Sequence, residues 1–235
     1  MSLRVGFDID GVLADFRTAF QQAADEAGIS SRAQAAETSA VDPLSSREIK
    51  AIWSHVKRSN NWWTRLQAYE PLQIVRLYEL ARRWKWEVVF MTRRPSTDGD
   101  PVQFQTQWWI EQYGFYYPAV VTVPGSRGEL ANALRLDVIV DDQLLNCVDV
   151  VGGSTSKALL LLRDGHDRAA EDHAIGRGIG VVKTLEEAID VISHMHESLG
   201  ERRGRLQRLT DWFGGTKAEA QPIPPAPDPN RAKLR

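Results

Sequence analysis

The residues best suited to chemistry are two aspartates, Asp8 and Asp10, which follow a short apolar run and precede Gly11. Residues two apart on an extended strand point to the same side, so this spacing predicts two carboxylates on one face. Such a pair is costly unless a cation neutralises it, and hard carboxylate oxygens favour magnesium. The alternative is that both acids only form a turn, because Asp and Gly are common turn residues.

Two further apolar runs also end in polar side chains. Thr92 directly follows the run at residues 87–91, and Asp141 and Asp142 directly follow the run at residues 137–140. The carboxyl ends of parallel strands form the ligand crevice of an open α/β sheet. We therefore expect these side chains at the same sheet edge as Asp8 and Asp10, which makes a chance set of turn residues the weaker explanation.

The elements that must position these residues alternate between strand-like and helix-like patterns. Strands are predicted over residues 3–8, 87–91, 119–123, 137–140 and 158–162. A charged loop is predicted after the fifth strand, before another short apolar run at 179–182. Their nearly continuous apolar composition is typical of parallel strands that are buried on both faces. Longer segments of helical period lie between them. The pattern predicts an α/β fold with a Rossmann-like, three-layer parallel sheet.

The interval between the first two predicted strands is too long for a single crossover. Helix-like stretches at residues 16–27 and 44–59 predict a helical insertion, in which residues 28–42 are left open as helix or loop. The predicted organisation is a core of residues 1–15 and 69–200, a cap of residues 16–68, and a tail of residues 201–235. The core ends with a helix over residues 185–199, opened by a capping box of Thr184 and Glu187.

Composition excludes several classes of protein. The chain has 235 residues and a net charge of −2, so a field that binds nucleic acid non-specifically is absent. One cysteine cannot form an internal disulfide or a Cys-rich zinc site. No apolar run approaches the length of a membrane span, and the start lacks the apolar stretch of a signal peptide, so a cytoplasmic location is expected. Whether the chain forms a homodimer is left open.

The tail differs from the rest of the chain. Residues 201–235 hold eight Lys and Arg against four Asp and Glu, and from Gly214 onward they are rich in proline with almost no large apolar residue. Such a composition cannot bury enough apolar surface to fold alone, so the basic, proline-rich tail is predicted to be partly disordered.

As an ordered set, these residues resemble the haloacid dehalogenase superfamily of aspartate-nucleophile phosphotransferases. Its motifs are a strand-end Asp-x-Asp, a strand-end Ser or Thr, a basic residue before the fourth strand, and an acidic pair after it. They match Asp8 and Asp10, Thr92, a basic candidate, and Asp141 with Asp142, across about residues 3–163. The resemblance implies the parallel sheet of this superfamily, with a small helical cap inserted after the first strand.

The resemblance also implies a role for each residue. Asp8 would attack phosphorus to form an aspartyl-phosphate, and Asp10 would act as general acid and then as general base. Mg²⁺ would be held by the Asp8 carboxylate, the Asp10 backbone carbonyl and Asp141, with Asp142 either outside the direct ligands or bound through water. Thr92 would hold the phosphoryl oxygens. An acid at position 10 favours a phosphatase over a dehalogenase, because a leaving alkoxide needs a proton.

The basic motif departs from the usual pattern of the superfamily. Arg127 and Arg135 are the basic residues between the third and fourth predicted strands, and the superfamily usually has Lys there. Arg127 is the better candidate, because it lies in a Gly-rich loop before a helix-like segment and Arg can bind phosphate through two nitrogens. The alternative is a solvated loop arginine. Arg93 and Arg94 are open to the same two interpretations, and Arg93 is taken as a candidate phosphate ligand.

Residues 8–16 are similar to the opening of the 5′(3′)-deoxyribonucleotidase family, whose small helical cap occupies the same place. This resemblance implies a magnesium-dependent phosphomonoester hydrolase acting on (deoxy)nucleoside monophosphates. Trp62 and Trp63, which follow Asn60 and Asn61, are candidates to stack on the base. The alternative is that they form the core of the cap, and this alternative is preferred for Trp53. The other tryptophans up to Trp109 are predicted to pack between sheet and helices.

Two alternatives to a nucleotidase remain. One is a phosphatase of the same superfamily that acts on sugar phosphates or polynucleotide ends, because residues 93–95 replace the small residues that the nucleotidase family carries there. The other is a non-catalytic protein that binds nucleic acid or a protein partner through its basic tail. The second is weaker, since such a protein would have little use for Asp10.

Overall fold

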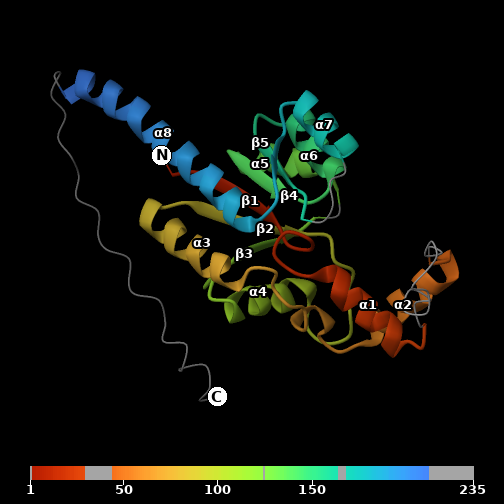
Figure 1. The fold of residues 1–235 in the computed structure, drawn as a ribbon. Coiled ribbons are helices and arrows are strands. Elements are labelled where there is room, and N and C mark those ends of the chain that lie inside the picture. Colours follow the sequence, from red (N-terminus) through yellow and green to blue (C-terminus); the bar gives the residue numbers. More distant parts are fainter. Residues whose placement is uncertain (1, 30–43, 124, 164–167, 212–235) are drawn as a thin grey trace, which may run out of the picture. The chain divides into compact units, whose positions relative to one another are not determined.

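The computed structural model describes residues 2–29, 44–123, 125–163 and 168–211 (Figure 1). The chain divides into two compact units, Met1–Asp190 and Val191–Arg235. The sheet and all of the predicted site residues lie in the first unit. Among the described helices, none has both the length and the apolar composition needed to cross a bilayer.

Six parallel strands form one sheet in the order β3-β2-β1-β4-β5-β6. The strands are β1 (Arg4–Asp8), β2 (Glu87–Thr92), β3 (Ala119–Thr122), β4 (Val138–Asp141), β5 (Lys157–Leu161) and β6 (Gly180–Val182). All four residues of β4 are buried, and only the first residue of β5 is exposed, as the apolar runs predicted. The sheet confirms the predicted α/β, Rossmann-like architecture.

Helices cover both faces of this sheet. The helices α3 (Pro71–Trp84) and α4 (Val102–Gln112) lie on one side, and α5 (Arg127–Leu134), α6 (Leu144–Gly153) and α7 (Arg168–Gly176) lie on the other (Figure 1). The segment that contains α7 was predicted as a charged loop. It is helical because Ala169 and Ala170 favour a helix, and Ala174 is buried in the cluster that includes Ile179.

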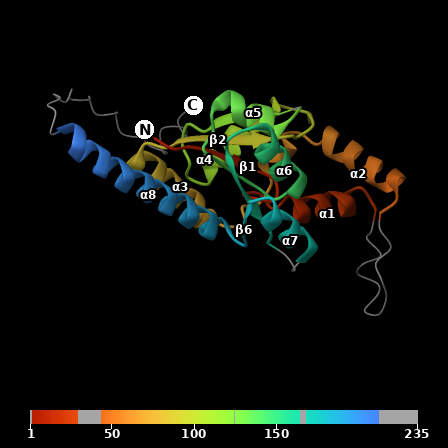
Figure 2. The same ribbon diagram turned by 90° about the horizontal axis from the view of Figure 1, so that it is seen from above.

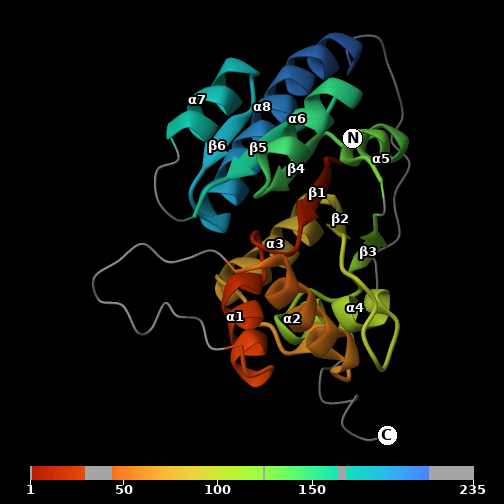
Figure 3. The same cartoon turned by 90° about the vertical axis from the view of Figure 1, so that its right-hand side faces the viewer.

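The insertion after β1 is helical, as predicted. It contains α1 (Phe16–Glu26), α2 (Ser46–Arg58) and a 3-10 helix, η2 (Trp62–Thr64), and α1 and α2 lie side by side beyond the end of β1 (Figures 2 and 3). A capping box between Ser45 and Glu48 opens α2. Most of the segment left open at residues 28–42 is outside the described residues. The boundaries of core and cap remain predictions.

Aromatic rings hold the insertion together. The ring centroid of Phe16 on α1 lies 5.9 Å from that of Trp53 on α2 and 6.2 Å from those of Trp62 and Trp63. The last two are 3% and 1% exposed. Aromatic pairs at these separations add to the stabilisation that burial provides. Trp62 and Trp63 therefore belong to the apolar interior of the helical insertion.

Two details of the fold differ from prediction. The last helix, α8 (Leu185–Asp211), runs twelve residues beyond the predicted end at residue 199, because residues 201–211 contain many helix-favouring Glu, Arg, Gln and Leu. The rest of the predicted tail lies outside the described residues. Trp109 is 1% exposed as expected, but Trp108 is 51% exposed and does not pack under the sheet. Cys147 is fully buried.

Candidate active site

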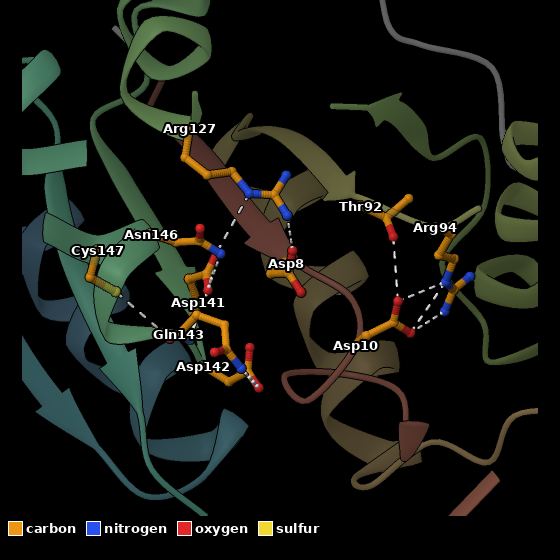
Figure 4. Close-up of polar contacts among 10 residues, drawn as sticks. All are labelled: Asp8, Asp10, Thr92, Arg94, Arg127, Asp141, Asp142, Gln143, Asn146 and Cys147. Carbon is orange, nitrogen blue, oxygen red and sulfur yellow. Dashed lines mark hydrogen bonds and ion pairs between the residues drawn. The ribbon is translucent and has the colours of Figure 1, made fainter. Parts of the chain in front are cut away.

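The strand register brings the predicted motifs to one edge of the sheet. Asp8 pairs with Met91, the residue before Thr92, and Phe7 pairs with Val140, the residue before Asp141. The three strands therefore end level with one another. Their polar side chains meet at the carboxyl edge of β1, β2 and β4 (Figure 4), where ligands bind in open α/β sheets.

Asp8 lies deep in this edge and contacts an arginine. It is 6% exposed and accepts a hydrogen bond from Nη2 of Arg127. Nε of the same guanidinium lies 3.6 Å from Oδ2 of Asp141. Burial, and next the charge of Asp141, raise the pKa of Asp8 well above its ordinary value, although Arg127 opposes this. Arg127 thus sits between two buried acids, and its Nη1 is buried without a hydrogen-bond partner among the described residues.

The loop before α5 places Arg127 in the site. Ser126 caps α5 by accepting from the N–H of Glu129, and Asp149 on α6 accepts from Ser126 Oγ at 2.8 Å and from the N–H of Gly128 at 2.9 Å. The contact with α6 is close, because a Cβ on Gly128 would lie 2.3 Å from the Asp149 carbonyl oxygen. Arg127 is therefore held by a helix start docked on α6 and is not a solvated loop residue.

Asp10 has a different partner from Asp8. Arg94 donates to both of its carboxylate oxygens, with Nε 2.9 Å from Oδ2 and Nη2 2.7 Å from Oδ1, and Thr92 Oγ1 lies 3.4 Å from Oδ2. Strand β1 ends at Asp8, so the alternation expected from the two-residue spacing does not extend to Asp10. The two carboxylates contact different residues on either side of β1 (Figure 4).

Arg94 is a site residue that the sequence left as either solvated or phosphate-binding. Its side chain is 0% exposed, and besides Asp10 it contacts Thr106 Oγ1 at 3.0 Å and the Trp63 ring at 4.7 Å. Arg93, its neighbour, is exposed. The available signal in the sequence was its position: Arg94 comes two residues after the end of β2, as Asp10 comes two residues after the end of the neighbouring strand β1.

Asp141 is fully buried and held by the start of α6. It accepts from the N–H of Gln143 at 2.8 Å and from Asn146 Nδ2 at 3.0 Å. Burial raises its pKa, although these hydrogen bonds oppose the change. The contacts of Gln143 and Asn146 with Asp141 were not predicted. The available signal was that two polar residues occur in the first turn after the acidic pair.

Asp142 closes the site above the turn that follows Asp10. It accepts from Gln143 Nε2 at 3.0 Å, and its pKa is raised to about 6, first by burial and then by the charge of Asp141. Gly11 has a φ of +88°, and a Cβ there would lie 2.1 Å from Asp142 Oδ2. Only glycine fits both the left-handed backbone and this close approach.

The site holds more negative than positive charge. Its four carboxylates, those of Asp8, Asp10, Asp141 and Asp142, outnumber its two buried guanidinium groups, those of Arg94 and Arg127, by two. A divalent cation that prefers oxygen ligands fits this imbalance. Within the described ranges, no three Asp, Glu, His or Cys side chains are placed to hold a metal by themselves. A bound Mg²⁺ would therefore need a backbone carbonyl and water besides carboxylates, as this ion commonly does.

A cavity of about 650 Å³ opens beside these acids. Asp8, Asp10, Asp142 and Arg127 form part of its wall, together with four aromatic side chains and three more arginines: Phe16, Trp53, Trp63, Tyr69, Arg17, Arg93 and Arg163. Of the two tryptophans that were candidates to stack on a base, Trp63 lines this cavity. Trp62 is packed against Trp63 with ring centroids 4.8 Å apart and is not among the lining residues. A second cavity, of about 660 Å³, lies beside α4 and contains none of the catalytic candidates.

Arg163 supports the turn that carries Asp10. It follows β5 and donates to the backbone oxygens of Gly11 at 3.2 Å and Val12 at 2.6 Å, and it forms an ion pair with Glu70. Glu70 also accepts from the N–H of Leu185 at 2.8 Å, at the start of α8. Sequence reasoning missed this pair, because its function is to bind backbone groups far away along the chain.

Solved structures with a similar fold include haloacid dehalogenase-type hydrolases. One from Streptococcus pneumoniae has a TM-score of 0.53 and 11% identity, covering 81% of this chain and 98% of its own. A hydrolase of that family from Deinococcus radiodurans R1, with bound phosphate and sodium, has a TM-score of 0.51 and 14% identity, covering 82% and 96%. A β-phosphoglucomutase-like protein from Thermotoga maritima has 0.50 and 15%, covering 82% and 99%.

No family model and no curated protein matches the sequence. At identities of 11–15%, the structural similarities establish the architecture and not the activity. The chain therefore has the haloacid dehalogenase fold that its ordered motifs predicted.

Proposed function

We propose that this protein is a magnesium-dependent phosphomonoester hydrolase that forms an aspartyl-phosphate on Asp8 and acts on nucleoside monophosphates. The observation that carries the proposal is the buried Nη1 of Arg127, which lacks a partner among the described residues while the same guanidinium binds Asp8. A buried donor without an acceptor is costly, and a phosphoryl oxygen placed for attack by Asp8 would supply the acceptor. The phosphate bound by the Deinococcus neighbour agrees with this chemistry.

Asp8 performs the first displacement. Its carboxylate attacks phosphorus, the bond to the leaving oxygen breaks, and the phosphoryl group is carried as an acyl phosphate. Arg127 neutralises charge on the phosphoryl oxygens, which is the main form of catalysis in phosphoryl transfer. Mg²⁺, held by the carboxylates of Asp8 and Asp141 and the Asp10 carbonyl with Asp142 nearby, would add positive charge at the same oxygens.

Asp10 performs the proton transfers. It gives a proton to the leaving oxygen in the first step and takes one from the attacking water in the second, after which Asp8 and inorganic phosphate are released. Arg94 and Thr92 orient this carboxylate from the β2 side of the site. Asp8 keeps its own arginine, so the two acids do not compete for one cation.

The aromatic wall of the cavity supports a nucleotide as substrate. The cavity wall beside the catalytic acids includes Phe16, Trp53, Trp63 and Tyr69, and stacking of a base on an aromatic ring contributes about 1–3 kcal/mol. The role of Trp62 becomes indirect in this proposal, because its ring packs against the edge or face of the Trp63 ring and does not line the cavity.

The test is phosphate release from a panel of deoxynucleotides, ribonucleotides, sugar phosphates and 3′-phosphorylated oligonucleotides, with Mg²⁺ or with EDTA. We expect Mg²⁺-dependent release, greatest for nucleoside monophosphates, and its loss in Asp8→Asn. Mass spectrometry of acid-quenched wild type should show a phosphorylated peptide that contains Asp8. Thermal unfolding of Asp8→Asn checks that the variant is folded.

Other results would contradict parts of the proposal. Full activity in folded Asp8→Asn would exclude the nucleophile. A preference for sugar phosphates or oligonucleotide ends would exclude the nucleotide substrate and retain the mechanism. No turnover of any ester, together with salt-sensitive oligonucleotide binding that is lost on truncation at residue 200, would favour the non-catalytic alternative.

A further inference from the structure

The cavity beside Asp8 contains more arginine than one phosphoryl group requires. Four arginines line it: Arg17, Arg93, Arg127 and Arg163. Arg127 is bound to the catalytic acids and has one nitrogen available for the phosphoryl group. Arg163 uses Nε, Nη1 and Nη2 on Gly11, Glu70 and Val12, so its charge serves the fold.

Arg93 and Arg17 differ from Arg127 and Arg163. Both are exposed, and they come from separate elements: Arg93 directly follows β2, whereas Arg17 is the second residue of α1. Within the described part of the chain, the Arg93 side chain has no hydrogen bond or ion pair. The Arg93 guanidinium therefore makes no polar contact that would stabilise the fold, although the residue lines the cavity and directly follows Thr92.

The cavity thus has two ends of different character. Asp8 and Arg127 form a buried end, each 6% exposed, and the exposed Arg93 and Arg17 form a cationic rim. Aromatic side chains, Trp63 among them, line the same cavity. A ligand that fills this space would present one anionic group to the buried end, a flat or apolar part to the rings, and anything charged at its far end to the rim.

We infer that the rim binds a second phosphate of the substrate, so that bisphosphates, and nucleoside bisphosphates in particular, are preferred over monophosphates. This inference rests on the proposed function and adds the chemical class of its substrate. Arginine binds phosphate through two parallel N–H groups, and an exposed pair of this kind is weakened by solvent. The rim also offsets the acidic inner end, where carboxylates would otherwise repel an approaching dianion.

The experiment compares matched pairs of substrates that differ by one phosphate. Deoxyadenosine 3′,5′-bisphosphate is compared with deoxyadenosine 5′-monophosphate, and glucose 1,6-bisphosphate with glucose 6-phosphate. We expect the wild type to have a lower KM for the bisphosphate of the nucleotide pair. Arg93→Gln should lose about three- to tenfold of this KM preference while kcat changes little, as expected for an exposed charge pair. Arg83→Gln, which removes an exposed arginine of α3 outside this cavity, is the matched control.

A binding measurement separates this inference from the proposed function. Calorimetry with folded Asp8→Asn and the same four ligands reports affinity without turnover. Tighter binding of bisphosphates that depends on Arg93 supports the rim even if the wild type hydrolyses nothing. Hydrolysis with equal KM values for both members of each pair, or a preference that Arg93→Gln leaves intact, would overturn the inference and retain the phosphatase. A preference seen in the glucose pair as well would show that the rim recognises the second phosphate without a base.

Discussion

Replacing Arg94 by Met should damage both stability and one catalytic step. The substitution removes a guanidinium with a fully buried side chain and leaves Asp10, whose side chain is 23% exposed, without its bidentate partner. It also removes the donor to Thr106 Oγ1 and the cation over the Trp63 ring. Breaking a buried ion pair from one side costs about 3–5 kcal/mol. Because water reaches Asp10, we expect the lower end, about 3 kcal/mol, in the free energy of unfolding.

The catalytic effect should depend on the leaving group. An alkyl phosphate needs a proton on its leaving oxygen, whereas p-nitrophenolate leaves without one, so only the first substrate depends fully on a well-oriented Asp10. General acid catalysis contributes about 10²- to 10⁴-fold, and we expect Arg94→Met to lower kcat for an alkyl phosphate by about 100-fold. The fall for p-nitrophenyl phosphate should be several-fold smaller.

Urea unfolding at pH 7 and initial rates with both esters measure these effects. Arg94→Lys keeps the charge but loses the two-nitrogen contact, so it should recover part of the stability and less of the rate. Arg83→Lys, on the exposed part of α3, controls for the type of substitution. If folded Arg94→Met slowed both esters equally, Arg94 would not act through Asp10. Unfolding within about 0.5 kcal/mol of wild type would contradict the buried pair itself.

Three other changes test separate parts of the structure. Gly11→Ala should displace the Asp142 carboxylate and weaken Mg²⁺-dependent activity, since its Cβ would lie 2.1 Å from Oδ2; unchanged Mg²⁺ titration of activity would argue against this contact. Hydrogen bonds from backbone N–H groups and an arginine lower the pKa of Glu70 below 4.5 although burial opposes this. Its stabilisation is therefore present above that pH and lost as pH falls through the folded-state pKa. Glu70→Gln should lower the free energy of unfolding by about 1–2 kcal/mol at pH 7 and by far less in acid. Urea unfolding at both pH values measures this loss, and an equal loss at the two would contradict the reasoning. Trp63→Leu should raise KM for nucleotides more than Trp108→Leu, whose ring lies outside the cavity, and equal KM values would place the base elsewhere.

The parts of the fold that were predictable depend on local sequence patterns. The apolar runs that end at Asp8, Thr92 and Asp141 are strands, and their register sets these residues at one edge of the sheet. This placement is expected for parallel strands of similar length that pair side by side. Segment α7 was missed because a short helix with one buried alanine leaves little periodic signal. The end of α8 was missed because basic residues that favour a helix also occur in disordered tails.

The partners of the acids were less predictable than the acids themselves. Arg127 was identified because its motif has a fixed place in chain order, and Arg94 could not be, because two adjacent arginines follow Thr92 and only the backbone direction decides which is buried. Arg163 binds carbonyl groups of residues more than 150 positions earlier. Contacts with backbone atoms carry no sequence signature, since any residue supplies the same acceptor.

The end of β1 at Asp8 explains how two aspartates of one motif acquire different environments. Had the strand continued through Asp10, both side chains would face the same way and compete for one counterion. Instead Asp8 contacts Arg127 from the β4 side, and Asp10 turns to Arg94 from the β2 side. Burial and Asp141 act on the pKa of Asp8, whereas Asp10 keeps access to water. In the proposed mechanism Asp8 is a nucleophile that must be held in place and shielded, and Asp10 is an acid–base group that must exchange protons. Different arginines for these two aspartates suit the two proposed roles.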